Sequence, residues 1–351
     1  MITFAPGPSK VYDALPKYLQ DAFAQGILSA NHRSAVFMDL YRETEQLFRD
    51  KLQVPADFTL LFTSSATESW EIISQSLVEH SSYHLYSGSF GKKWLEYAQY
   101  ILPTTQGHKL GANESIPVDH LQLGPEVDLI AVTQNETANA SQVPMSVLKA
   151  LGARYPEKMI AVDTTSSMGG IALDFSLADV WYASVQKCFG LPAGLGILLL
   201  SGKAKEKVAR KGEKGRYNSL SFMLENASSY QTHYTPNVLG IYLLNRVLQA
   251  MEPIAQVDVR LRARMAALEE VVKQSATFDL LVDNSATRST TVLAVSGKEE
   301  AIVAVKKAAE KEGMQLGGGY GPLKSTSFRI ANFPAITDAE FMRLVDFIKQ
   351  Y

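Results

Sequence analysis

A lysine and an aspartate, each close behind a short apolar run, are the residues of this chain best placed to do chemistry. Lys187 follows the run Val180–Ala183, and Asp163 ends the run Met159–Val162. If both runs are strands of one α/β sheet, their carboxyl ends meet at a crevice where ligands bind. A lysine can form a Schiff base with pyridoxal phosphate, while an aspartate keeps the pyridine nitrogen protonated. The pair favours such a site, although most lysines are solvated surface charges.

Three further segments carry groups that would suit the same cofactor. The segment TSSATE follows a predicted strand and opens a helix, with Ser65 and Glu68 spaced as a capping box. Free N–H groups of such a first turn can bind a phosphate. Phe90 could stack on a ring, and the hydroxyl of Thr137 in the NET segment could reach a phenolic oxygen. Their structural alternatives are an ordinary N-cap, a core aromatic and a loop that caps a helix.

Three basic features are candidate anion sites. His32 and Arg33 are adjacent in the loop SANHRSAVF, where a surface pair is the alternative explanation. Arg329 lies in SFRIANF, and its side chain would face the side of a strand opposite to its apolar neighbours. A guanidinium there can bind a carboxylate through two parallel hydrogen bonds, or it can mark an edge strand. The run Lys203–Arg216 holds seven basic residues and is interpreted as a solvated helix and loop rather than an anion site.

Short apolar runs that alternate with amphipathic segments predict an α/β fold with a mainly parallel sheet covered on both faces. The predicted strands are Phe58–Phe62, His84–Tyr86, Asp128–Thr133, Met159–Val162, Val180–Ala183 and Gly196–Leu200, and the helices between them are Ala35–Leu52, Ala66–Val78, Phe90–Ile101 and Met145–Gly152. Two long helices, Pro236–Ala250 and Ile254–Gln274, then lead into a smaller α+β unit. Its elements are Phe278–Val282, Thr290–Val295, Glu300–Gly313, Ser327–Ala331 and Asp338–Gln350.

The length of 351 residues predicts two domains. We expect an extended N-terminal segment, residues 1–18, in which prolines prevent a helix and which packs with the small domain. A large domain, residues 19–250, would bind the cofactor, and residues 251–351 would form the small C-terminal domain. The formal net charge of −2 argues against nucleic acid as the partner, and no apolar stretch reaches membrane-spanning length. One cysteine, Cys188, and no signal peptide predict a cytoplasmic protein.

Taken together, these segments resemble the class V aminotransferases of pyridoxal-phosphate fold type I, and within that class the phosphoserine aminotransferases. The similarity extends from FAPGPSKV to the last helix. Its most specific parts are NHRS, the NET loop, the block from Asp163 to QKCFGLPAGLG, and YTPNVLGIY. The resemblance implies pyridoxal 5'-phosphate as cofactor, small amino acids and 2-oxo acids as substrates, no metal, and a homodimer with shared active sites.

The resemblance also implies a role for each matching residue. Lys187 would carry the Schiff base and Asp163 would pair with the pyridinium nitrogen. Other cofactor contacts would come from Ala66, Thr67, Phe90, Thr137, Gln186 and Thr235, the last reaching the cofactor phosphate of the other subunit. Phe90 stands where those relatives usually have a tryptophan. Arg329 would bind the substrate α-carboxylate, and His32 with Arg33 the substrate phosphate.

Two departures leave the substrate open. The stretch GGGYGPLKST before Arg329 has no second His–Arg pair, so GYGPLKSTSFRI is closer to the alanine–glyoxylate and serine–glyoxylate aminotransferases. Tyr234 replaces an asparagine of the phosphoserine pattern. Lys324 could supply a cation, although as a point charge rather than a fork. The sequence-based hypothesis is transamination of O-phospho-L-serine with 2-oxoglutarate, in serine biosynthesis. The alternatives are an alanine–glyoxylate or serine–glyoxylate aminotransferase and a non-catalytic ligand-binding protein that retains the fold. A cysteine desulfurase is disfavoured, because it needs a cysteine on a mobile loop far along the chain and Cys188 adjoins the lysine.

Overall fold

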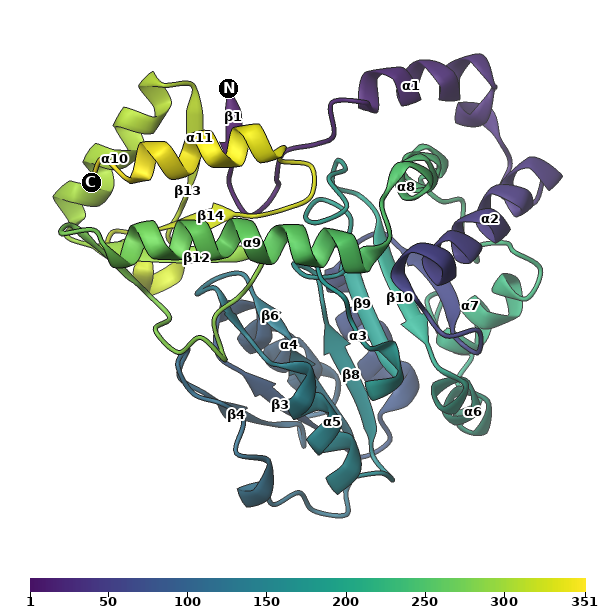
Figure 1. The fold of residues 1–351 in the computed structure, drawn as a ribbon. Helices are drawn as coiled ribbons and strands as arrows, with labels where there is room; N and C mark the ends of the chain where they lie inside the picture. The colour runs from purple at the N-terminus through teal and green to yellow at the C-terminus, as the bar shows by residue number, and fades with distance from the viewer.

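Three consecutive strands of the chain are buried at every position, and they form the middle of the larger sheet. They are β8 (Met159–Asp163), β9 (Val180–Ser184) and β10 (Gly196–Leu200). Strands that are apolar along their whole length need cover on both faces. The computed structural model, which describes residues 1–351, provides that cover with helices around a seven-stranded sheet (Figure 1).

The larger sheet has the order β2-β10-β9-β8-β5-β3-β4. Its remaining strands are β2 (Thr59–Thr63), β3 (Ser81–Tyr86), β4 (Gln106–Lys109) and β5 (Val127–Thr133). Strand β10 is antiparallel to both β2 and β9, and the other pairs are parallel. All strands except β10 therefore point the same way, and their carboxyl ends lie along one edge of the sheet.

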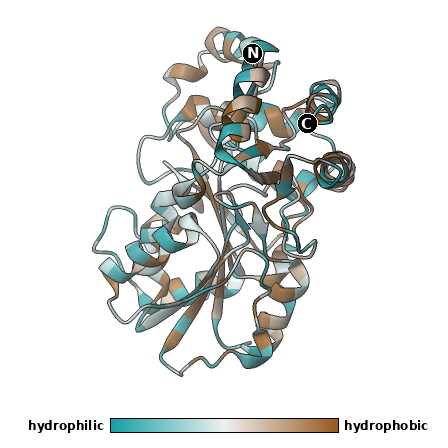
Figure 2. Ribbon diagram, turned by 90° about the vertical axis from the view of Figure 1, so that its left-hand side faces the viewer, coloured by the Kyte–Doolittle hydropathy of each residue, from teal (hydrophilic) through white to brown (hydrophobic).

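Helices surround this sheet and bury their apolar sides on it. They are α2 (Ala35–Leu52), α3 (Ala66–Leu77), α4 (Ser89–Ile101), α5 (Met145–Arg154), α6 (Gly202–Lys211), α7 (Leu220–Ala227) and α8 (Val238–Ala250). Figure 2 shows hydrophobic colour along the central strands and hydrophilic colour on outward helix faces. The core includes Trp181 and Tyr182 of β9 and Phe62 of β2, all nearly inaccessible to solvent. No helix has both the length and the apolar composition needed to cross a bilayer.

A second sheet of five strands carries its own core. Its order is β1-β13-β14-β12-β11, formed by Ile2–Phe4, Met314–Gly318, Ser327–Ala331, Val292–Gly297 and Phe278–Leu280 respectively. Helices α9 (Ile254–Lys273), α10 (Glu299–Lys311) and α11 (Asp338–Ile348) pack with it. Helix α9 crosses between the two sheets (Figure 1) and contributes Leu261 to one core and Met265 to the other. The division after residue 250 stays a prediction.

Some elements differ from those predicted. The expectation of extended chain to residue 18 is wrong, because α1 (Leu15–Ala24) starts inside it. Pro16 occupies the first turn of α1, where a missing N–H costs nothing and the fixed φ suits a helix. Strands β1, β4 and β13 were not predicted, because they are short or polar. Lys203–Arg216 does begin with a helix, α6, whose lysines bond to backbone carbonyls and carboxylates around them.

Candidate active site

The chemically relevant side chains follow the carboxyl ends of neighbouring strands, where the parallel sheet forms its binding edge. Asp163 ends β8, and Lys187 comes three positions after the end of β9. Thr137 follows β5 through the short strand β6 (Asn135–Glu136), which pairs with β7 (Ser141–Gln142). Phe90 follows β3 at the start of α4. The sheet topology therefore brings together residues that are far apart in the sequence.

The amine of Lys187 is buried and makes two hydrogen bonds. Its Nζ donates to the carbonyl of Pro6 at 2.8 Å and to the hydroxyl of Thr137 at 3.3 Å. Burial, together with the positive charge of Arg329, lowers the pKa of Lys187 to about 8, while the negative charge of Asp163 opposes the shift. A neutral amine is the form that attacks a carbonyl, so this environment prepares Lys187 as a nucleophile.

Asp163 is buried beneath the same cavity, with only 4% of its surface exposed. Its carboxylate accepts a hydrogen bond from the Thr165 N–H at 2.9 Å. Burial raises the pKa of Asp163, against hydrogen bonds from Thr165 and Tyr182 and the charge of Lys187, which lower it. A positively charged group above the carboxylate would stabilise its ionised form, which is what a pyridinium nitrogen provides.

The first turn of α3 presents a row of free N–H groups to the cavity. Ser65 accepts from the Glu68 N–H at 3.2 Å, as predicted, but the capping box is incomplete. The Glu68 carboxylate reaches back to the N–H and hydroxyl of Ser64 instead, each at 2.7 Å. The N–H groups of Ser65, Ala66 and Thr67 consequently have no partner within the chain. Three adjacent donors at a helix N-terminus are suited to a phosphate.

Phe90 and Gln186 complete the walls of the cavity. The ring centroid of Phe90 lies 5.6 Å from Lys187 Nζ, and the ring of Tyr320 packs behind it with centroids 5.2 Å apart. The Gln186 side-chain oxygen accepts from the Ser184 hydroxyl at 2.6 Å, which leaves its amide nitrogen free of partners in the chain. An aromatic face and an amide donor thus border the same space.

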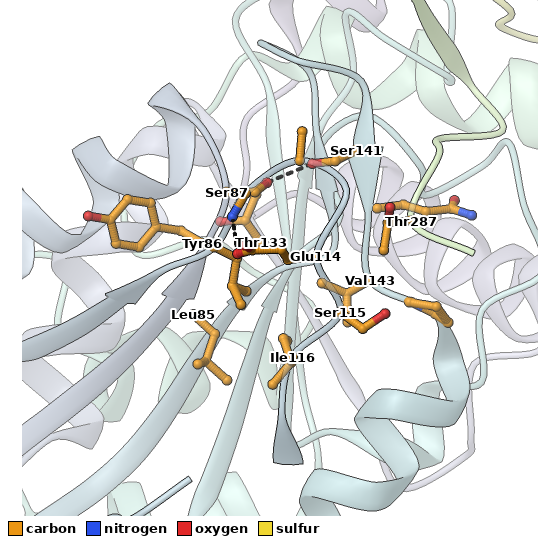
Figure 3. Close-up of a pocket in the computed structure, with 15 residues that line it drawn as sticks. Leu85, Tyr86, Ser87, Glu114, Ser115, Ile116, Thr133, Ser141, Val143 and Thr287 are labelled. Atoms are coloured by element: carbon orange, nitrogen blue, oxygen red, sulfur yellow. Dashed lines mark hydrogen bonds between the residues drawn. The ribbon is translucent and has the colours of Figure 1, made fainter. Parts of the chain in front are cut away.

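The cavity between these groups has a volume of about 220 Å³. It is lined by Lys187, Asp163, Phe90, Thr137, Gln186 and the first turn of α3. A neighbouring hollow between Leu85, Ile116 and Val143, in which Ser87 bonds to Ser141, measures only about 10 Å³ and has room for a single water (Figure 3). The cavity of about 220 Å³ combines an amine, a carboxylate, an aromatic face and N–H donors suited to a phosphate, and this combination fits pyridoxal phosphate.

Arg329 lies beside this cavity and is fixed by two hydrogen bonds. Its Nε donates to the Gly318 carbonyl at 2.7 Å and its Nη1 to the Thr137 carbonyl at 2.8 Å. The guanidinium also lies 5.4 Å from the ring centroid of Tyr320. Its Nη2 group makes no hydrogen bond within the chain, so the fork retains donors for a carboxylate.

Besides Arg329, which lies next to the cavity, three predicted site residues do not line the cavity of this chain. His32 is half-buried and Arg33 exposed, in the loop before α2. Burial lowers the pKa of His32, and the charge of Arg33 adds to that effect. Thr235 is exposed in the segment before α8. Their assignment to substrate and cofactor phosphates stays a prediction that requires a second subunit.

The N-terminal segment reaches the site in a way that the sequence analysis missed. Besides the Pro6 carbonyl on Lys187, the Ser9 hydroxyl donates to the carbonyl of Gln186 at 2.9 Å. A Cβ added at Gly7 would lie 2.8 Å from Lys187 Nζ, so a larger residue there would displace the end of the lysine side chain. The signal was the segment APGPS, of which only the prolines were considered, as evidence against a helix.

Cys188, next to the lysine, points away from the cavity. Its side chain belongs to the small-sheet core and its thiol lies 3.4 Å from the Ser166 carbonyl. Burial raises the pKa of the thiol well above its ordinary value. A buried, protonated thiol is a poor nucleophile, which counts against the cysteine desulfurase alternative.

The fold and the cavity define an α/β enzyme built to hold a phosphate-bearing aldehyde against a lysine. Comparison with known proteins narrows this class. The sequence profile of class V aminotransferases matches residues 4–321, and the chain belongs to that family of pyridoxal-phosphate-dependent enzymes. It is 27% identical to a phosphoserine aminotransferase of Rhodococcus opacus, over 97% of this chain and 92% of the relative.

Solved structures agree with the sequence comparison. The crystal structure of a phosphoserine aminotransferase from Cytophaga hutchinsonii superposes with a TM-score of 0.94 and 31% identity, covering 99% of this chain and 98% of that one. An alanine–glyoxylate aminotransferase from Nostoc superposes with a TM-score of 0.83 at 21% identity, covering 99% and 94%, and shares the fold. The predicted class and fold are thereby confirmed, and the chain is a pyridoxal-phosphate-dependent aminotransferase.

Proposed function

We propose that the enzyme transfers the amino group between O-phospho-L-serine and 2-oxoglutarate, giving 3-phosphohydroxypyruvate and L-glutamate. The observation that carries this choice is the similarity along nearly the whole chain to proteins named phosphoserine aminotransferase, at 27% and 31% identity. The cavity described above supports the chemistry, because it unites a nucleophilic amine, a buried carboxylate and a phosphate cup.

When bound, pyridoxal phosphate supplies an electron sink for the charge that develops at the substrate α-carbon. Lys187 would hold the cofactor and then move the α-proton as general base and acid, for which a pKa of about 8 is well suited. Asp163 would keep the ring nitrogen protonated. Arg329 would bind the substrate α-carboxylate with its free donors, so that the reacting carbon lies near Lys187.

Recognition of the substrate phosphate would rest on His32 and Arg33, delivered by the second subunit of a homodimer. The hollow beside the active site offers further positive charge. It measures about 420 Å³, and Lys92, Lys109 and Tyr320 are among its lining residues, which include no carboxylate. Lys92 pairs with Glu96 at 3.2 Å, whereas Lys109 makes no ion pair. Net positive charge at the mouth favours a substrate that carries a second anionic group.

A glyoxylate aminotransferase is the second candidate, and a specific feature favours it. The loop from Gly317 to Thr326 contributes Tyr320 to the site but no histidine or arginine, so it offers no fork for a phosphate. Alanine and serine carry no phosphate, so an enzyme that uses them as amino donors needs no such fork. The exposed Lys324 on the same loop is not among the residues lining the hollow.

A half-reaction screen separates these functions. Purified enzyme loaded with pyridoxal phosphate is mixed with phosphoserine, serine or alanine, and the visible absorbance band of the cofactor is followed as it changes to that of pyridoxamine phosphate. We expect conversion with phosphoserine at the lowest concentration. Conversion with alanine or serine alone would establish the glyoxylate alternative, and a protein that takes up no pyridoxal phosphate would indicate a non-catalytic role.

A further inference from the structure

A buried glutamate behind the active site makes contacts that the mechanism above does not use. Glu136, in β6, is fully buried between the loop before α4 and the loop that carries Thr137. Glu136 makes no hydrogen bond to Lys187, whereas its neighbour Thr137 does. Burial of a carboxylate costs free energy unless both of its oxygens accept hydrogen bonds.

All the hydrogen bonds of this carboxylate come from backbone N–H groups. Oε2 accepts from the N–H of Phe90 at 3.0 Å and from that of Gly91 at 3.1 Å, and Oε1 accepts from the N–H of Ala138 at 2.9 Å. Phe90 and Gly91 belong to the first turn of α4, whose N-cap, Gly88, has no side chain to cap it. Glu136 therefore caps α4 from another part of the chain.

The loop before α4 packs closely against the Glu136 side chain. A Cβ added at Gly88 would lie 2.5 Å from Glu136 Cγ, so the loop before α4 closes directly onto the glutamate side chain. A second bond, from the Asn139 amide to the Ser87 carbonyl at 3.1 Å, ties the same two loops together. These contacts join the loop before α4 to the loop that carries Thr137.

We propose that Glu136 is a positioning residue. Through its hydrogen bonds to the first turn of α4, it would hold the ring of Phe90 in place relative to Thr137 and Lys187, where the ring can stack on the cofactor. This inference rests on the cofactor-binding part of the proposed function. The residue type follows from the donors: a carboxylate is an acceptor at both oxygens, whereas a glutamine would turn its NH₂ group toward at least one N–H. An aspartate would keep the charge but fall short by about 1.5 Å, one carbon–carbon bond.

Binding of pyridoxamine phosphate, which cannot react with Lys187, tests the role of Glu136 in holding the ring. Equilibrium dialysis at pH 8 would compare the wild type with Glu136→Gln, Phe90→Leu and the double variant. We expect Glu136→Gln to weaken binding about tenfold, the scale of losing charge-assisted hydrogen bonds. Phe90→Leu should weaken it by a similar factor. Because Glu136 acts through Phe90, the double variant should bind no more weakly than Phe90→Leu.

The matched control is Glu96→Gln, which removes an exposed carboxylate on the same helix, and it should bind like the wild type. Visible circular dichroism of the loaded protein gives a second readout, and Glu136→Gln should lower its amplitude because the ring no longer has one orientation. If Glu136→Gln does not fold, Glu136→Asp takes its place, with an expected intermediate loss.

Two results would overturn the inference: unchanged binding in Glu136→Gln, or a double variant whose loss equals the product of the two single losses. The second result would mean that Glu136 acts independently of Phe90. A wild type that fails to bind pyridoxamine phosphate would instead refute the proposed cofactor site, so the two failures are distinguishable.

Discussion

The lowered pKa of Lys187 predicts how fast the empty enzyme captures its cofactor at each pH. Only the neutral amine attacks the aldehyde, and the pKa of about 8 means that about one-tenth of the Lys187 amines are neutral at pH 7. For an unperturbed lysine the neutral fraction at pH 7 is roughly 0.03%, about 300-fold less. Burial is the main cause of this difference and Arg329 the second.

Stopped-flow mixing of the empty protein with pyridoxal phosphate measures the effect. We expect the capture rate to rise about tenfold per pH unit below about pH 7, to reach half its maximum at about pH 8 and to level off above about pH 9. Capture by N-acetyl-lysine methyl ester, measured in parallel, corrects for ionisation of the cofactor itself. In Arg329→Gln the inflection should move to higher pH, because a positive charge near the amine is removed. Arg329→Lys retains the charge and should keep the inflection close to that of the wild type.

The reasoning fails if the wild-type rate continues to rise toward pH 10, since Lys187 would then be an ordinary solvated amine. It also fails if Arg329→Gln leaves the inflection in place while Arg329→Lys moves it. Either outcome would show that the environment of the cavity does not control the ionisation of Lys187.

Three further predictions concern stability. Because the folded pKa of Lys187 lies below its unfolded value, the empty protein should gain stability as the pH rises from about 8 to 10.5, and urea titrations of Lys187→Met should lack that part of the slope. Gly196→Ala should destabilise by about 1–3 kcal/mol and impair cofactor retention on dialysis, because the new Cβ would lie 2.6 Å from the Ser65 carbonyl carbon beneath the phosphate cup; an unchanged denaturation midpoint would contradict this. Lys211→Met should lower the free energy of unfolding by about 1 kcal/mol, since its amine caps the last carbonyls of α3, whereas the exposed Lys214→Met should have no effect.

Much of the large sheet could be predicted because its strands are continuous apolar runs. Burial on both faces leaves few residue types at Met159–Val162, Val180–Ala183 and Gly196–Leu200, so local composition marks these strands without further information. Strands β4 and β13 were not predicted, because neither is a continuous apolar run. The former is a polar edge strand, and the latter is recognisable only through its partners Ile2–Phe4 and β14.

The sequence by itself determined the chemistry of this protein. The roles proposed for Lys187 and Asp163 require a lysine and an aspartate, and these residue types can be read directly from the sequence. The tertiary structure decided which backbone and side-chain groups surround these two residues. The Pro6 carbonyl on the amine, the three free N–H groups of α3 and the carboxylate of Glu136 under Phe90 all depend on backbone atoms brought together by strand order. Backbone donors and acceptors are the same at every residue, so only the fold can show which of them face the site.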